Sequence, residues 1–315
     1  MYLDLTGRVL ASLWALNYGR AMKRAWLLAG IILSGCQPLE APTGVSSPPA
    51  NAASAKNAGP LRVVSLDYCA DQYVLKMVPR TRIRALSQDA QKPFSYMRED
   101  AAGLPRVSGS AEDVILLRPD LVVRSYGGGP GAAAFFERAG ISVLNVGWAN
   151  DIASVKKTIL AMADGLGAAD IGAEIITDMD QRLAALPALD HRPSALYMTP
   201  SGVTSGRKSL VNEVLETAGY DNFLTKSGWH SLPLERLAYE APDVIAAAFF
   251  DSQPLETDRW SAMRHPIARA QLSRRPVAAL SGASMSCAGW WIIDAVEALS
   301  AAQSQTRQPG REASQ

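Results

Sequence analysis

Histidine and cysteine are scarce in this chain, with three of each among 315 residues. His191, His230 and His265 are scattered along the sequence, which gives little support to a local zinc site or to histidine-based catalysis. The motifs G-x-x-x-x-G-K-S/T, G-x-S-x-G and H-E-x-x-H, which mark common nucleotide-binding and hydrolytic sites, are absent. A formal net charge of +1 gives no indication of nucleic-acid binding. The sequence therefore predicts a protein that is not an enzyme and has no cofactor or directly bound metal.

One dinucleotide-type motif is present and is discounted. Residues 129–134 fit G-x-G-x-x-A, and Asp151 follows at the distance expected of a ribose-binding acid. However, Pro130 removes an amide donor from the loop, the predicted helix behind it is short, and the preceding strand is not the first of its sheet. A glycine-rich turn that brings the backbone close to a ligand explains these residues equally well.

The apolar run near the N-terminus is short. Residues 22–36 have a basic start, an apolar centre and small residues before Cys36, which is typical of a secretory signal and too short to span a bilayer. Residues 33–36 resemble the lipobox of bacterial lipoproteins, which implies cleavage before Cys36 and acylation of this residue. The alternative is an ordinary signal peptide with an incidental cysteine. Translation is expected to begin at Met22, with residues 1–35 as the signal region.

Two polar segments are expected to flank the folded part. Residues 36–60 are rich in Ala, Pro, Ser and Asn and are expected to form a flexible tether behind the lipid anchor. Residues 303–315 are expected to form a disordered tail. This arrangement predicts a lipoprotein at a membrane surface, in the periplasm or on another extracytoplasmic face.

The rest of the chain contains one unit twice. Residues 112–123 and 235–246 each begin with a glutamate, carry an apolar residue two positions later and Pro-Asp seven positions later, and end in aliphatic residues. Each copy predicts a short helix, a break and a buried strand. The copies lie 123 residues apart, which indicates two similar α/β lobes rather than a solenoid.

Strands and helices alternate through both halves. Strands are predicted over 62–66, 83–87, 121–125, 142–146, 195–199, 244–250 and 277–280, and further helices over 70–77, 209–218 and 290–301. Residues 151–187 carry a helical apolar stripe that Gly165 and Gly167 break into two helices, the second roughly 30 Å long at ~1.5 Å per residue. The predicted fold is α/β, with two Rossmann-like lobes at 61–150 and 188–302, parallel sheets, one long connecting helix and a ligand cleft between the lobes.

Aromatic residues cluster at the predicted strand ends, where ligands of parallel sheets bind. With one arginine among them, they predict a wide pocket for a large, partly apolar ligand. The predicted ligand-binding residues are Tyr68, Tyr96, Arg124, Tyr126, Trp148, Trp229, Phe250 and Trp290. Cys69 and Cys287 also follow predicted strands, and we favour unpaired cysteines over a disulfide because a bond across a cleft would restrain its opening.

Four segments together resemble the substrate-binding proteins of ABC importers for iron siderophores, haem and vitamin B12. They are residues 62–66, 112–123, 204–222 and 294–299. The resemblance covers residues 61–302 and implies two α/β lobes joined by one long helix. It also implies a non-catalytic protein that captures an iron-siderophore, a haem-type chelate or cobalamin and delivers it to an ABC permease and its ATPase.

Glu112 and Glu235 fall on the two docking glutamates of that family, one in each lobe, which face arginines of the permease. An acid in the first turn of a helix is also favoured by ~0.3 to 1 kcal/mol through the helix dipole. Two alternatives stay open: an extracytoplasmic enzyme that uses the same cleft, and a zinc or manganese receptor, which needs clustered histidines and carboxylates.

Overall fold

The computed structural model describes residues 61–188, 191–248 and 261–306 of the chain. The chain divides into two compact units, Met1–Ala55 and Lys56–Gln315, and all described residues belong to the second. The predicted signal region, Cys36, the tether and Phe250 lie outside the described residues. Among the described helices, none is long and apolar enough to cross a membrane.

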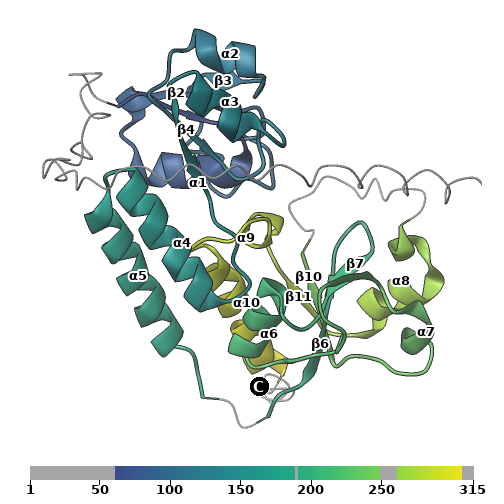
Figure 1. Ribbon diagram of the computed structural model, residues 1–315. Coiled ribbons are helices and arrows are strands. Elements are labelled where there is room, and N and C mark those ends of the chain that lie inside the picture. The colour runs from purple at the N-terminus through teal and green to yellow at the C-terminus, as the bar shows by residue number, and fades with distance from the viewer. Residues whose placement is uncertain (1–60, 189–190, 249–260, 307–315) are drawn as a thin grey trace, which may run out of the picture. The chain divides into compact units, whose positions relative to one another are not determined.

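The N-terminal lobe is built on a parallel sheet with the strand order β3-β2-β1-β4-β5 (Figure 1). Its central strands consist largely of buried aliphatic residues, because helices cover both faces of a sheet of this kind. The strands are β1 (Val63–Ser65), β2 (Ile83–Ser87), β3 (Arg106–Val107), β4 (Leu121–Arg124) and β5 (Ser142–Asn145). Parallel pairing brings their carboxyl ends to one edge, where the loops that follow them lie together.

Two helices of this lobe, α1 and α2, begin at polar caps. Asp67 caps the first helix by accepting a hydrogen bond from the Ala70 N–H, and Ser110 caps the next one by accepting from the Asp113 N–H. The helical segments are α1 (Tyr68–Met77), η1 (Arg80–Arg82), α2 (Ala111–Leu116) and α3 (Ala132–Arg138).

Two helices follow the lobe, α4 (Ile152–Gly165) and α5 (Ala169–Ala184), and they pack side by side (Figure 1). The predicted break between them is confirmed, since the chain turns at Gly167 with φ +67°. Close packing needs a glycine at position 172, because a Cβ atom there would lie 2.5 Å from the Cβ of Ala163. α5 is about 24 Å long at ~1.5 Å per residue, and it ends at Ala184 rather than at Pro187.

The C-terminal lobe contains a parallel sheet with the order β11-β10-β6-β8 and a separate antiparallel pair, β7 with β9. The strands are β6 (Ser194–Met198), β7 (Val203–Ser205), β8 (Asp221–Asn222), β9 (Trp229–Ser231), β10 (Val244–Ala247) and β11 (Val277–Ala279). The helices are α6 (Leu210–Thr217), α7 (Leu234–Leu237), η2 (Ala262–Arg264), α8 (Pro266–Arg274), α9 (Gly282–Met285) and α10 (Ile292–Thr306).

The repeated unit has the same structural role in both lobes. In each copy, the aspartate of Pro-Asp pairs with the residue at the start of the lobe's first strand. The Asp120 carboxylate accepts from the Arg62 N–H at 2.8 Å, and the Asp120 N–H donates to the Arg62 carbonyl at 2.9 Å. Asp243 and Ser194 make the same two bonds at 2.8 and 3.0 Å. The two lobes are therefore built on one repeated strand-pairing device, as the sequence repeat predicts.

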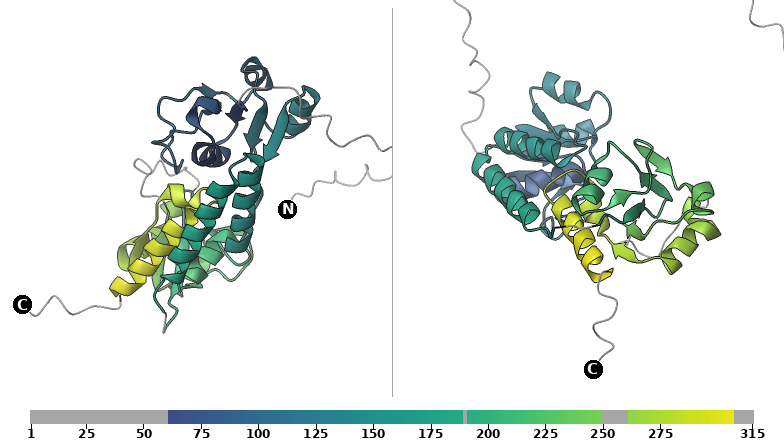
Figure 2. Two further views of the ribbon diagram at one scale, coloured as in Figure 1. Left: turned by 90° about the vertical axis from the view of Figure 1, so that its left-hand side faces the viewer. Right: turned by 90° about the horizontal axis from the view of Figure 1, so that it is seen from below.

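A continuous core connects the two lobes. Buried side chains of α1, α4, α5, α6 and α10 belong to one cluster, in which Trp291 and Tyr73 are among the largest fully buried residues. α5 and α10 lie side by side (Figure 2), and Arg182 on α5 makes ion pairs with Asp294 and Glu297 on α10, both at 2.6 Å. α10 extends to Thr306, so residues 303–306, predicted to belong to a disordered tail, are helical.

Candidate functional site

A pocket of about 290 Å³ lies among loops of both lobes. The N-terminal lobe contributes the loops that follow β1, β4 and β5, as expected for the carboxyl edge of a parallel sheet. The C-terminal lobe contributes the start of α6, Trp229 on β9 and the segment between α9 and α10. The lining residues are Tyr68, Cys69, Ser125, Tyr126, Val146, Gly147, Trp148, Ala149, Asn150, Ser209, Leu210, Val211, Val214, Trp229, Met285, Ser286, Cys287, Ala288 and Ile292.

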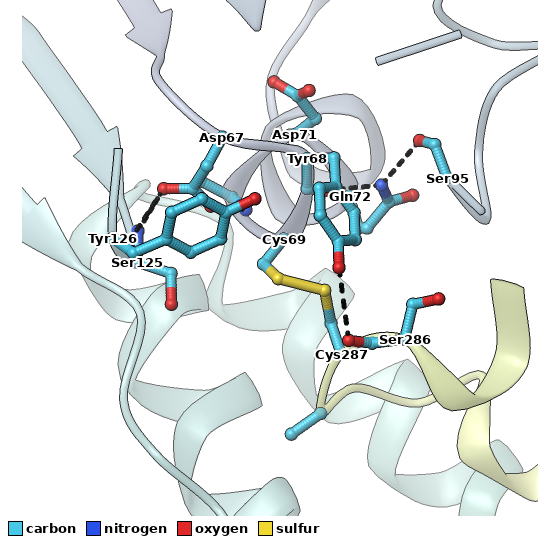
Figure 3. The surroundings of a disulfide bond; sticks show 12 residues. Asp67, Tyr68, Cys69, Asp71, Gln72, Ser95, Ser125, Tyr126, Ser286 and Cys287 are labelled. Carbon is cyan, nitrogen blue, oxygen red and sulfur yellow. Dashed lines mark hydrogen bonds between the residues drawn. A yellow bond between two sulfur atoms is a disulfide. The ribbon is translucent and has the colours of Figure 1, made fainter. Parts of the chain in front are cut away.

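Asp67 organises the N-terminal wall of this pocket. It is 2% exposed, and its two carboxylate oxygens accept hydrogen bonds from the first turn of α1 and from the loop after β4. One oxygen caps α1 through the Ala70 N–H at 3.0 Å. The other accepts from the N–H groups of Ser125, Tyr126 and Gly127 at 2.6, 3.0 and 2.8 Å (Figure 3). A single buried carboxylate therefore fixes the start of α1, which carries Tyr68, relative to the loop of Tyr126.

The glycine-rich segment after β4 lies in close contact with the residue that directly follows β1. A Cβ atom on Gly127 would lie 2.4 Å from the carbonyl oxygen of Leu66, so only glycine fits there. Arg124 completes the loop by donating to the carbonyl oxygens of Gly127 at 2.7 Å and Gly129 at 3.0 Å. Arg124 was predicted to contact the ligand, but it does not line the pocket because its guanidinium binds its own loop.

Four of the predicted aromatic residues do line the pocket: Tyr68, Tyr126, Trp148 and Trp229. Three of them present open ring surfaces, since Tyr126 is 53%, Trp148 is 82% and Trp229 is 55% exposed. Tyr68 lies deeper, with ring contacts to Phe94 at 4.8 Å and to Tyr126 at 6.2 Å. Burial raises the pKa of the Tyr68 and Tyr126 hydroxyls, so both stay protonated at neutral pH.

The cysteines are bonded to each other, so the expectation of unpaired cysteines is wrong. Cys69 on α1 and Cys287 between α9 and α10 form a disulfide with a Cα–Cα distance of 5.7 Å (Figure 3). The bond lies beside existing contacts between the lobes: the Tyr73 hydroxyl donates to the Ala288 carbonyl at 2.9 Å, and the Tyr68 hydroxyl donates to the Ser286 carbonyl at 3.5 Å. A bond at a point where the lobes already meet adds little restraint to the exposed rim of the pocket.

Tyr96 and Trp290, also predicted to contact the ligand, do not line this pocket. The Tyr96 hydroxyl donates to Asp294 at 2.6 Å, and its ring stacks on Trp291 at 5.5 Å. Trp290 packs edge-on against Tyr73 at 5.6 Å. These aromatic residues join the lobes behind the pocket. The remaining predicted residue, Phe250, lies outside the described residues.

The chemistry of the lining is apolar and neutral. Among the described residues, no Asp, Glu, Lys, Arg or His side chain lines the pocket. No group of three or more His, Cys, Asp or Glu residues suited to a metal ion occurs in the described part of the chain. The pocket offers aromatic faces, the Ser125 hydroxyl, the Asn150 amide and backbone groups, which suit a bulky ligand with apolar faces and hydrogen-bonding edges.

A second carboxyl group lies behind the pocket wall. Asp71 on α1 is fully buried and accepts from the Ser87 N–H at 3.0 Å and from the Ser87 hydroxyl at 2.6 Å. Burial raises the pKa of Asp71 to about 6, although the hydrogen bonds from Ser87 oppose this shift. Asp71 therefore changes charge in a mildly acidic range while holding α1 against β2.

Both predicted docking acids are exposed in the first turn of a short helix, Glu112 on α2 and Glu235 on α7. Neither carboxylate makes an ion pair or a hydrogen bond with another described residue. The neighbouring Asp113 differs, because its carboxylate accepts a hydrogen bond from the Ser108 hydroxyl and its backbone N–H donates to the Ser110 hydroxyl. Neither glutamate lines the pocket.

Two α/β lobes with a pocket between their loops define the class of two-lobed solute-binding proteins. The sequence model of the periplasmic binding protein family matches residues 65–259, and the chain belongs to that family. The members of this family are binding proteins, and the family places the folded body outside the cytoplasm. A comparison with curated proteins gives no match.

Solved structures with the same fold include three with different ligand classes in their descriptions. The periplasmic heme-binding protein RhuT from Roseiflexus is 20% identical, with a TM-score of 0.64, over 79% of this chain and 100% of that chain. The vitamin B12-binding protein BtuF of Vibrio cholerae is 17% identical, with a TM-score of 0.54, over 78% and 98%. A protein of an Fe3+-hydroxamate transport system from Saccharomonospora viridis is 20% identical, with a TM-score of 0.57, over 78% and 93%.

Proposed function

We propose that this protein is the substrate-binding component of an ABC importer and that it captures a bulky metal chelate or corrinoid between its lobes for delivery to a permease. The observation that carries this proposal is the aromatic rim of Tyr126, Trp148 and Trp229 around a pocket whose described lining has no charged side chain. Family membership supports it, as do similar solved structures that are described as heme-binding, as vitamin B12-binding and as an ABC-type Fe3+-hydroxamate transport system.

The absence of charged side chains from the described lining narrows the ligand class. Haem carries two propionate carboxylates and ferric catecholates carry several negative charges, and burying such groups without a cationic partner is costly. Cobalamin, with its amide side chains, and ferric hydroxamates have neutral hydrogen-bonding edges, which match the serine and asparagine side chains of the pocket. We therefore expect the protein to prefer a chelate or corrinoid that has little negative charge on its buried side.

Fluorescence quenching of the pocket tryptophans tests both statements. The panel consists of haemin, cyanocobalamin, a ferric trihydroxamate and a ferric catecholate, and the neutral probes are expected to bind more tightly. Trp148→Ala and Trp229→Ala should each weaken the best probe about tenfold by removing one stacking surface. Tyr239→Ala, which removes an exposed ring that does not line the pocket, is the matched control. Chemical conversion of a bound probe, or tight binding of bare Zn²⁺ or Mn²⁺ instead of the panel, would contradict the proposal.

The docking role of Glu112 and Glu235 is part of this proposal. One acid in each lobe is exposed and makes no ion pair within the described residues, so each is available to an arginine of the permease. A single exposed pair contributes ~0 to 1 kcal/mol, but two pairs act on one body. Reversing both charges, Glu112→Arg with Glu235→Arg, should abolish uptake of the best probe in cells and leave its affinity in solution unchanged. Loss of affinity together with uptake would contradict the docking role.

A further inference from the structure

Each lobe exposes a large apolar side chain four residues after its predicted docking acid. Leu116 follows Glu112 and is 79% exposed, and Tyr239 follows Glu235 and is 92% exposed. Leu116 is the last residue of α2, and Tyr239 lies in the turn two residues after the end of α7, so each apolar side chain follows its acid at the end of one short helical segment. Isolated exposed hydrophobic residues are normal on proteins. Here the same combination occurs at the same register in both copies of the repeat.

A buried residue fixes the orientation of each helical turn. Val114 and Leu237 each lie two residues after the acid, and both are buried in the lobe core. Because this middle position points inward, the acid before it and the apolar residue after it face outward. The repeat therefore encodes a short helical segment that exposes an acid at its start and an apolar side chain at its end or in the turn that follows it.

The charges beside the second pair are already satisfied within the chain. Arg236 donates to Glu240 at 2.7 Å and to the Phe223 carbonyl at 2.6 Å, and its guanidinium lies over the Phe223 ring. Glu235, the acid of this pair, makes no ion pair or hydrogen bond with a described residue. The surface thus offers one free negative charge and one apolar side chain.

Each pair follows a segment that is connected to the pocket. A Cβ atom on Gly128, in the loop of Tyr126, would lie 3.8 Å from the carbonyl oxygen of Gly109, two residues before α2. In the other lobe, Trp229 lines the pocket, and Glu235 follows it six residues later in the sequence, in the first turn of α7.

We propose that Glu112 with Leu116 and Glu235 with Tyr239 form two matching docking pairs, and that Leu116 and Tyr239 are apolar anchors for the permease. The occupant is a membrane partner with two similar sites, each with a cationic side chain beside an apolar depression. Its two sites match the two copies of the pair on this chain. This inference rests on the proposed function, in which the same two glutamates dock on the permease.

The test measures binding of the full-length protein to its permease–ATPase complex in nanodiscs by biolayer interferometry. Leu116→Ser and Tyr239→Ser should each weaken binding about five- to thirty-fold, as central interface residues do. Leu116→Met and Tyr239→Phe should restore it, because they keep an apolar group of similar size. Leu160→Ser, which removes an exposed leucine from α4, is the matched control and should change nothing. Melting temperatures should be unchanged, since both anchor side chains are exposed.

Four outcomes would overturn the inference. If Glu112→Gln and Glu235→Gln weaken binding and the anchor variants do not, the acids dock alone, and the proposed function stands. If no variant of either pair changes binding to the permease, docking uses another surface. If light scattering detects dimers of this chain that the serine variants abolish, while permease binding is unchanged, the pairs serve a second copy. Failure of the native protein to bind the permease at all would contradict the proposed function as well.

Discussion

The buried carboxylate of Asp67 allows a quantitative test of how the pocket is held together. Asp67→Asn keeps the size of the side chain but leaves one acceptor oxygen where the native residue has two. Four backbone N–H groups currently bind the carboxylate, three on one oxygen and one on the other. We expect the asparagine oxygen to face the three donors of Ser125, Tyr126 and Gly127, which leaves the start of α1 without its cap.

The expected loss of stability follows from these bonds. Loss of the helix cap costs about 1 kcal/mol. Three hydrogen bonds to a charged acceptor become bonds to a neutral one, at about 0.5 to 1 kcal/mol each. The free energy of unfolding should therefore fall by roughly 2.5 to 4 kcal/mol. The two loops should also lose their fixed relative position, so affinity for the best-binding probe of the panel should fall along with stability.

Urea unfolding followed by tryptophan fluorescence measures the stability, and quenching measures the affinity. The matched control is Asp151→Asn, which replaces the exposed carboxylate cap of α4 by an amide cap. We expect this control to keep the native stability, because asparagine caps a helix about as well as aspartate, and to bind the probe normally. If Asp67→Asn behaves like the control in both assays, the carboxylate does not hold the two loops together and the reasoning is refuted.

Three further predictions concern the disulfide, the buried acid and the anchor. The double variant Cys69→Ser with Cys287→Ser should have a free energy of unfolding that is lower by about 5 kcal/mol, because the unfolded chain regains the entropy of a loop closed over 218 residues. A urea midpoint equal to the native one would contradict this prediction. Asp71, with its pKa raised from 3.8 to about 6, stabilises the fold less as pH rises through that window. The native protein should therefore lose about 1.4 kcal/mol of unfolding free energy per pH unit between pH 3.8 and about 6, relative to the Asp71→Asn variant. Urea titrations of both proteins at several pH values measure this difference. A difference in stability that does not change with pH would argue against the raised pKa. Cys36→Ser should release the protein from membranes without changing probe affinity, because each buried methylene of a lipid anchor adds ~0.8 kcal/mol; unchanged membrane partitioning would count against lipidation.

The central strands were predictable because they are short runs of aliphatic residues with breaks on both sides. β2 has the bounds predicted for it, and β4 and β10 follow the two Pro-Asp breaks. The antiparallel pair of β7 and β9 was missed, since Thr204 and Ser205 are polar yet fully buried there. α8 and α9 were missed because the first has a weakly apolar sequence and the second is a single turn.

The candidate site was predictable only in part, because sequence indicates which residues follow strands but not what they contact. Tyr126 and Trp148 were recognised by that position. Arg124 has the same kind of position, but its guanidinium binds nearby carbonyls. Asp67 was missed: a cap of α1 is a local feature, whereas its second oxygen binds a loop 58 to 60 residues further along the chain. Such long-range pairing follows from the packing of the sheet.

The bond between Cys69 and Cys287 also determines the covalent topology of the protein. It closes most of the folded body into one ring, with a separation of 218 residues between the two cysteines. A single cut by a protease anywhere in this ring opens it but releases no fragment. Cut and intact protein therefore have the same subunit size until the disulfide is reduced. Proteolytic damage to this binding protein outside the cytoplasm thus becomes visible only in the presence of a thiol.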